Sequence, residues 1–107
     1  MLGRVTIVGC GLIGGSLVKR LRERKSATRI SAVDTEEVLV KARPYLDEGA
    51  TPGSPSKVAL VAESDLVVLA TPVGCIARDL GWVLEAVGPD AVVTDTGSVS
   101  EIGRAHV

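Results

Sequence analysis

The sequence predicts an α/β domain in which a doubly wound parallel sheet carries helices on both faces, giving three layers, α/β/α. Three observations predict this class. Short aliphatic runs, typical of strands buried on both faces, recur along the chain. Longer segments with apolar residues at helical spacing separate these runs, and the boundaries fall at turn-forming residues. Strands and helices that alternate in this way build right-handed crossovers onto one parallel sheet.

The composition fits a single compact domain over residues 1–107. The chain is 46% hydrophobic and 23% charged, which is enough apolar material for one core. It holds one Trp, one Tyr and no Phe, so Val, Leu, Ile, Ala and Gly must supply the packing. We expect tightly packed helices on an aliphatic sheet.

The first half of the chain predicts two strands, each followed by a helix. Residues 5–8 form a β-branched and aliphatic run that stops at Gly9. A helix with apolar residues on one face is expected to begin near Ile13 and to continue to Lys25. Residues 30–33 predict the next strand. A helix over residues 35–46 should follow, bent or ended early by Pro44.

The second half continues the alternation. A short third strand is expected near Ala50 and Thr51, within a loop rich in Gly and Pro. Ser54 as N-cap and Pro55 at the first helical position predict a helix through residue 62. Further elements are predicted from the aliphatic runs and the helical spacing: a strand over 66–70, a helix over about 76–87, a strand over 91–94 and the start of a last helix.

A glycine-rich turn stands between the first strand and the first helix. Gly9-Cys10-Gly11-Leu12-Ile13-Gly14 matches G-x-G-x-x-G. In a dinucleotide-binding Rossmann fold the first glycine makes the tight turn, the second lets the backbone approach the pyrophosphate, and the third lets helix and strand pack closely. The pyrophosphate would sit on the amides at the positive end of the helix. The alternative is an ordinary strand-to-helix turn that binds nothing.

Asp34 ends the second predicted strand about 20 residues after the motif, where a carboxylate receives the adenosine ribose hydroxyls. Because a 2′-phosphate would meet its negative charge, Asp34 favours NAD over NADP. Alternatively, Asp34 is the N-cap of the next helix, with Glu37 completing a capping box. Both roles are compatible.

Charge and cysteine content narrow the function classes. A formal net charge of −1 gives no electrostatic reason to expect a nucleic acid or an acidic membrane as partner. The basic residues at 19–25 complement a helix C-terminus and are expected to be solvated. Cys10 and Cys75 lack the number and spacing of a disulfide framework or a metal site. We expect a soluble, cytoplasmic protein without a bound metal.

The ends of three strands carry longer motifs. They are V-G-C-G-L-I-G-G-S at residues 8–16, S-D-L-V-V-L-A-T-P-V at 64–73 and T-D-T-G-S-V-S at 94–100. In content, order and spacing these motifs resemble the prephenate and arogenate dehydrogenases of tyrosine biosynthesis. The resemblance implies an NAD(P)-binding Rossmann domain followed by a helical domain that dimerises and completes the active site. It also implies hydride transfer from the substrate to NAD, coupled to decarboxylation.

By the same resemblance, Thr71 and Pro72 line the nicotinamide ribose, and Ser98 lies near the substrate hydroxyl, which it helps to orient. Ser98 also begins a capping-box pattern with Glu101, so it alternatively only starts the last helix. Ser100 stands where the family usually carries Lys. The family's H-P-x-A-G stretch, with its catalytic histidine, does not occur. His106 does not match it and is expected to be an exposed tail residue.

These departures predict that the helical C-terminal domain is absent from residues 1–107 and that the chain alone does not turn over. The expected partner is a small substrate, prephenate or arogenate, and a homodimer is possible through the missing domain. Two alternatives remain: another NAD(P)-dependent reductase of the imine or 3-hydroxy-acid type, and a non-catalytic dinucleotide-sensing module.

Overall fold

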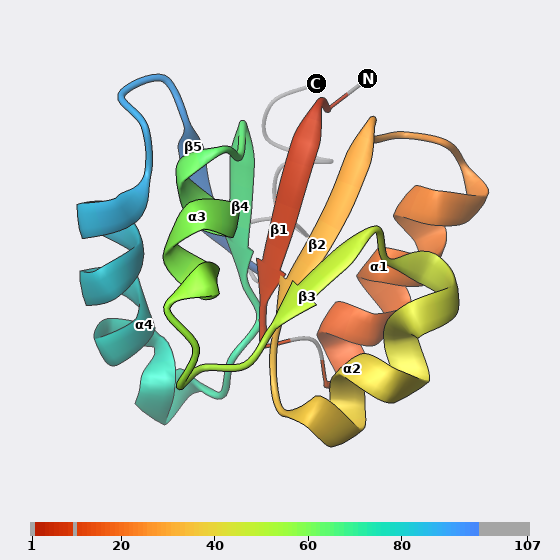
Figure 1. Ribbon diagram of the computed structural model, residues 1–107, viewed down its shortest axis with the longest axis horizontal. Coiled ribbons are helices and arrows are strands. Elements are labelled where there is room, and N and C mark those ends of the chain that lie inside the picture. Colours follow the sequence, from red (N-terminus) through yellow and green to blue (C-terminus); the bar gives the residue numbers. More distant parts are fainter. Residues whose placement is uncertain (1, 10, 97–107) are drawn as a thin grey trace.

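The fold, in a computed structural model that describes residues 2–9 and 11–96, is a twisted parallel sheet between two pairs of helices (Figure 1). The strands of this part of the chain are β1 (Arg4–Val8), β2 (Arg29–Val33), β3 (Glu48–Ala50), β4 (Leu66–Leu69) and β5 (Val92–Asp95). They pair in the order β3-β2-β1-β4-β5, and every pairing is parallel. The helices are α1 (Leu12–Glu23), α2 (Glu36–Ala42), α3 (Ser56–Ala62) and α4 (Val73–Ala86), with a 3-10 turn η1 (Arg43–Tyr45).

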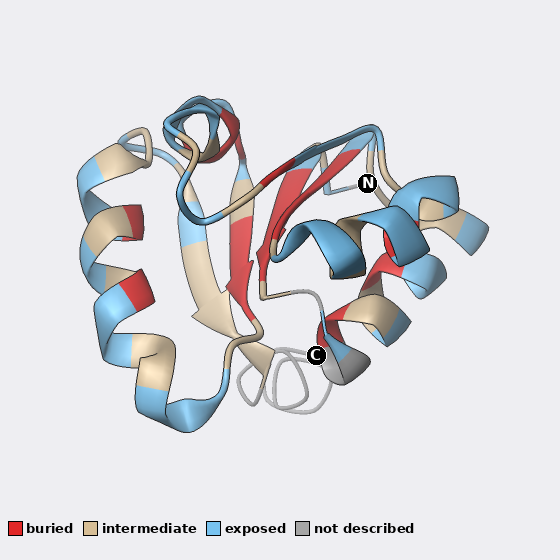
Figure 2. Ribbon diagram, turned by 60° about the horizontal axis from the view of Figure 1, so that its bottom comes forward, coloured by how far each residue is buried: buried red, intermediate tan, exposed pale blue. Residues whose placement is uncertain are grey.

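Two hydrophobic clusters cover the two faces of the sheet. Because side chains alternate along a strand, neighbours in β1 belong to different clusters: Ile7 packs on the α1 and α2 side, Val8 on the α3 and α4 side. Figure 2 shows the buried residues concentrated on β1, β2 and β4, whereas β5 is only partly covered. Full burial of a Val, Leu or Ile side chain contributes about 1.5–3 kcal/mol. The chain is thus a Rossmann-type α/β domain with three layers, as predicted.

The predicted elements that fall within the described residues are confirmed, with small shifts at their ends. The predicted start of a last helix lies outside the described residues. The helix expected over 35–46 ends at Ala42, and Pro44 lies in the following 3-10 turn. The third strand, expected near Ala50 and Thr51, is β3. The last strand extends to Asp95, one residue further than expected.

The predicted start of α3 is wrong by one residue. Pro55, not Ser54, is the N-cap, and α3 begins at Ser56. The reason is an initial tight turn, in which the amide of Lys57 donates to the carbonyl of Ser54 at 3.3 Å. Ser54 still contacts the start of α3, because its Oγ accepts the amide N–H of Ser56 at 3.2 Å.

Candidate dinucleotide-binding site

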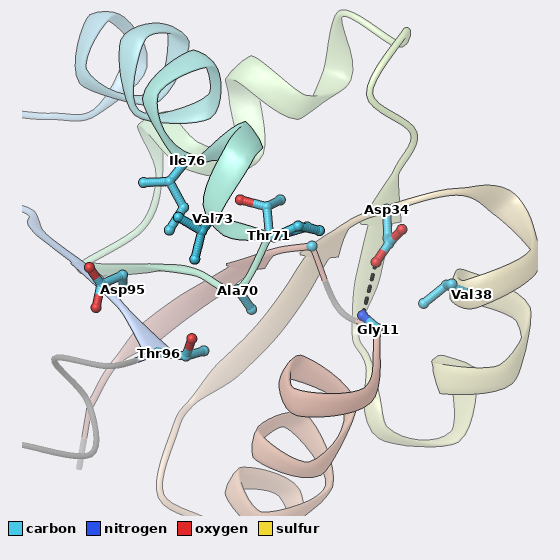
Figure 3. A pocket seen from close by; sticks show the side chains of 11 residues that line it. Gly11, Asp34, Val38, Ala70, Thr71, Val73, Ile76, Asp95 and Thr96 are labelled. Atoms are coloured by element: carbon cyan, nitrogen blue, oxygen red, sulfur yellow. Dashed lines mark hydrogen bonds between the residues drawn. The ribbon is translucent and has the colours of Figure 1, made fainter.

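The parallel strands place all their carboxyl ends at one edge of the sheet. At this edge α1 leaves β1 toward one face, whereas α4 leaves the adjacent β4 toward the other (Figure 1). Ligands bind at such a switch point in open α/β sheets. A cleft of about 720 Å³ opens there (Figure 3). Its lining residues are Gly9, Gly11, Asp34, Val38, Ala70, Thr71, Pro72, Val73, Ile76, Asp95 and Thr96.

The first and third glycines of the motif are required by the packing. Gly9 has φ +83°, and a Cβ there would lie 2.5 Å from the Thr71 methyl and 2.9 Å from the Thr71 amide nitrogen. A Cβ on Gly14 would lie 2.7 Å from the Gly9 carbonyl oxygen and 3.2 Å from the Ala70 methyl. Only glycine lets α1 start this close to β1 and β4.

The second glycine faces open space. A Cβ on Gly11 would have no atom within 4 Å. Gly11 is the N-cap of α1, where no side chain caps the helix and the first turn holds no acidic residue. Leu12, Ile13 and Gly14 are the first three helical residues, and their amides belong to the positive end of α1. This backbone can hold an anion, and the absent Cβ leaves room for it.

Asp34 reaches back to the glycine turn. Its Oδ2 accepts the amide N–H of Gly11 at 3.1 Å (Figure 3), and its Oδ1 accepts the amide N–H of Thr35 at 2.6 Å. The alternative of Asp34 as N-cap with Glu37 is wrong, because the N-cap of α2 is Thr35, whose Oγ1 accepts the amide of Val38 at 3.4 Å. Asp34 instead continues the sheet, donating its own amide to the Ala50 carbonyl at 3.1 Å.

Thr71 and Pro72 follow β4 and form the opposite wall. The Thr71 hydroxyl oxygen is buried and has no hydrogen-bond partner among the described residues. Pro72 is the N-cap of α4. Next to it, Val73 is 88% exposed and lines the cleft together with Ile76. This end of the cleft therefore combines an apolar surface with a buried hydroxyl that a ligand could engage.

A second cavity, of about 620 Å³, adjoins the first. It shares Gly9, Asp34 and Thr71 with the main cleft and continues over α3 and α4. Its remaining lining residues are Val8, Val33, Thr35, Pro52, Gly53, Lys57, Arg78, Asp79 and Trp82. The two cavities together form one groove across the ends of the central strands.

Side chains from α3 and α4 shape this second cavity, and the sequence analysis did not identify them. The Trp82 indole N–H donates to Asp79 Oδ1 at 3.1 Å. The Lys57 ammonium lies 4.5 Å from the centre of the Trp82 ring and donates to the Pro52 carbonyl at 2.8 Å. The one local signal is the i, i+3 spacing of Asp79 and Trp82 on one helix face. The cation–π contact joins two helices, and no spacing along the chain predicts it.

Other singled-out residues lie elsewhere. Ser98, His106 and Cys10 fall outside the described residues. Cys75 is half-buried near the start of α4. Of the basic residues at 19–25, four are exposed as expected, namely Lys19, Arg20, Arg24 and Lys25. Over residues 2–9 and 11–96, no helix is long and apolar enough to span a membrane, and no cluster of His, Cys, Asp or Glu is placed to hold a metal.

The chain is similar to known proteins in sequence and in fold. Residues 17–105 match the family described as prephenate dehydrogenase, nucleotide-binding domain. Prephenate dehydrogenase from Aquifex aeolicus, in complex with hydroxyphenyl propionate and NAD+, is 32% identical, with a TM-score of 0.76 over 89% of this chain. Arogenate dehydrogenase from Synechocystis is 29% identical, with a TM-score of 0.71 over 85% of this chain.

The match covers only part of these enzymes. This chain corresponds to 33% of the A. aeolicus chain and 31% of the Synechocystis chain. A putative NADP oxidoreductase from Bacteroides fragilis shares the fold, with a TM-score of 0.67 at 20% identity. The family match spans most of the chain, and the A. aeolicus likeness spans nearly all of it. The chain belongs to the prephenate and arogenate dehydrogenase family, of which it carries the nucleotide-binding domain.

Proposed function

We propose that this chain is the NAD-binding part of an enzyme that oxidatively decarboxylates prephenate or arogenate, with NAD supplying the hydride acceptor. The observation that carries the proposal is the convergence, at one edge of the sheet, of an uncapped helix N-terminus, a glycine with open space before it and the Asp34 carboxylate. The A. aeolicus enzyme, whose matched third has a similar fold, is known in complex with NAD+.

The groove suggests how the dinucleotide would lie. The amides of Leu12, Ile13 and Gly14 would hold the pyrophosphate at the N-terminus of α1. Asp34 would receive the adenosine ribose hydroxyls. From Asp34 the groove continues toward Trp82, between α3 and α4, and offers the adenine a site there.

The nicotinamide would then occupy the other end of the main cleft. Thr71 and Pro72 would line its ribose, and the buried Thr71 hydroxyl would gain a partner there. Val73 and Ile76 would exclude water from one side of the ring. In this proposal, Thr71 and Pro72 bind the ribose, and Val73 and Ile76 shield the ring from water.

Cofactor choice depends on the charges around the ribose. The Asp34 carboxylate would repel a 2′-phosphate, which favours NAD over NADP. Lys57 and Arg78 line the same cavity. However, Lys57 is engaged by the Pro52 carbonyl and the Trp82 ring, and Arg78 lies 3.6 Å from Asp79. We therefore expect weaker binding of NADP than of NAD.

Only part of the substrate half of the active site would come from this chain. Ser98 would orient the substrate hydroxyl, and a helical domain would supply the catalytic histidine, enclose the substrate and form the dimer. In this proposal the enzyme acts in the cytoplasm. The 107 residues alone should bind NAD and produce no NADH from prephenate.

Fluorescence of the single tryptophan tests the binding step. Because Trp82 lines the second cavity, NAD and ADP-ribose should each change its emission saturably, whereas nicotinamide mononucleotide, which lacks the adenosine, should not. An emission unchanged by millimolar NAD, together with an unchanged melting temperature, would contradict the proposal.

A chimera tests the reaction. In it, this chain replaces the matched third of the A. aeolicus enzyme, and NADH formation is followed with prephenate and with arogenate separately. Turnover of either substrate supports the proposal. A folded chimera that binds NAD and oxidises neither substrate would instead favour a reductase of another specificity or a dinucleotide sensor.

A further inference from the structure

The Asp34 carboxylate has two backbone partners. One is the amide N–H of its own neighbour Thr35, and the other is the amide N–H of Gly11, 23 residues earlier in the chain. We infer that Asp34 is a positioning residue for the pyrophosphate, because it holds the glycine turn in its anion-binding shape, in addition to receiving the ribose. This inference rests on the proposed NAD-binding function and extends it.

The turn lacks the device that usually holds a helix start. In a capping box, a Glu or Gln at the third helical position accepts the N–H of the N-cap residue. In α1 the N-cap is Gly11 and the third helical position is Gly14. Gly14 cannot be replaced by a longer residue, because a Cβ there would lie 2.7 Å from the Gly9 carbonyl oxygen. The close packing of α1 therefore excludes a local capping box.

Asp34 supplies the missing acceptor from the neighbouring strand. The turn is joined to the end of β2 by two hydrogen bonds, from the Gly9 amide to the Val33 carbonyl at 2.8 Å and from the Gly11 amide to Asp34. Of the amides at the start of α1, the Asp34 side chain thus occupies only that of the N-cap residue, Gly11. The amides of the first helical turn stay available for a phosphate.

The carboxylate can serve both tasks at once. An ionised carboxylate accepts about four hydrogen bonds, and the backbone uses one on each oxygen. The remaining acceptor sites suffice for two ribose hydroxyls. Its negative charge, by contrast, repels a pyrophosphate, so a useful test must separate the hydrogen bond from the charge.

Two neutral variants make this separation. Asp34→Asn keeps an acceptor for the Gly11 amide, whereas Asp34→Leu has nearly the same shape and no acceptor. The probe is inorganic pyrophosphate, which has no ribose, and its affinity is measured from the shift of the Gly14 amide resonance. Because both variants lack the charge, their difference reports the hydrogen bond. We expect Asp34→Asn to bind pyrophosphate about 2- to 10-fold more tightly than Asp34→Leu.

Hydrogen exchange of the Gly11 amide gives a second readout, independent of any ligand. Exchange should be slow in the unchanged chain and in Asp34→Asn, and faster in Asp34→Leu. Asp34→Ala replaces Asp34→Leu if the latter does not fold. Equal pyrophosphate affinities in the two neutral variants would overturn the inference, as would equal Gly11 exchange. Failure of the unchanged chain to bind NAD, with Gly11 protected as expected, would instead refute the proposed function.

Discussion

The N-termini of α1 and α2 lie at the same edge of the sheet, after adjacent parallel strands, yet they are built in opposite ways. In α2 the Thr35 hydroxyl caps the helix, and Glu36 and Glu37 place negative charge in the first turn. In α1 the N-cap is Gly11, without a capping side chain, and the first turn has no acid. The two helix starts thus differ in the capping side chain and in the acidic residues of the first turn, the two groups that satisfy a helix N-terminus.

This difference shows which helix start is complete within the protein. An anion at α2 would meet two carboxylates and a capped amide. An anion at α1 would meet the free amides of the first helical turn and the open space before Gly11, with the one nearby carboxylate, Asp34, bonded to the Gly11 amide. A helix end that lacks its own cap costs stability, and a ligand that supplies the cap recovers it. Anion binding is therefore expected at α1, where the capping side chain and the acidic residues of the first turn are missing.

Replacing Gly9 should have the largest effect on the α1 side of this comparison. Gly9→Ala forces a Cβ against Thr71 at a φ of +83°. The left-handed backbone and the overpacking together should lower the free energy of unfolding by roughly 2–5 kcal/mol. Urea denaturation measures this loss. Gly81→Ala is the matched control, because Gly81 is exposed inside α4 with no atom near its missing Cβ, and it should be stabilising by about 0.5–1 kcal/mol. If Gly9→Ala lowers the free energy of unfolding by less than about 0.5 kcal/mol, as an ordinary surface substitution does, the turn does not require glycine at this position.

Removing the cap of α2 should have an intermediate effect. Thr35→Ala takes away the acceptor of the Val38 amide, and such losses cost about 1 kcal/mol. Denaturation gives the total, and amide exchange in residues 36–38 gives its location. If the free energy of unfolding is unchanged, α2 does not depend on the Thr35 cap, and the two helix starts do not differ in the way described above.

The smallest effect is expected at the opposite end of α1. The Asp47 carboxylate accepts the Ile30 amide and pairs with Arg22, each at 2.8 Å. Burial raises the pKa of Asp47, but the hydrogen bond from Ile30 and the interactions with Arg22 and Arg29 outweigh it and lower the pKa below its usual value of 3.8. A lowered pKa stabilises the fold above the unfolded-state pKa, and this contribution is lost as the pH falls through the folded-state value.

Asp47→Asn measures that contribution. Because both partners are more than a third exposed, the cost should not exceed about 1 kcal/mol near neutral pH. The stability difference between the two proteins should stay constant between about pH 5 and 7 and shrink below the usual pKa of the carboxyl. A difference that grows on acidification would contradict the assigned direction.

Much of the fold could be predicted because its signals are local. The glycine motif, the aliphatic runs and Pro44 each act within a few residues, and each produced the expected turn, strand or helix end. The position of Asp34 at the cleft follows from the same local pattern. These features depend on backbone sterics and on periodicity, which a sequence displays directly.

The parts that could not be predicted depend on tertiary contacts. Asp34 and Thr35 are both good N-cap residues, and pairing of the Asp34 amide with Ala50 of β3 decides between them. The contact of Lys57 with Trp82 exists only because α3 and α4 pack side by side. The bond from Asp34 to Gly11 likewise requires β1 and β2 to be neighbours in register.

The proposed function requires that the N-terminus of α1 bind the dinucleotide. Calorimetric titration with NAD tests this requirement in three proteins: the unchanged chain, Gly11→Asp and Gly81→Asp. The two variants add the same charge, one at the start of α1 and one on the exposed face of α4. Gly11→Asp should place a second carboxylate beside Asp34 at the start of α1 and weaken NAD binding at least about tenfold, because the added negative charge repels the pyrophosphate. Gly81→Asp should bind like the unchanged chain. Equal NAD affinity in all three proteins, or no binding by any of them while folded, would contradict the claim.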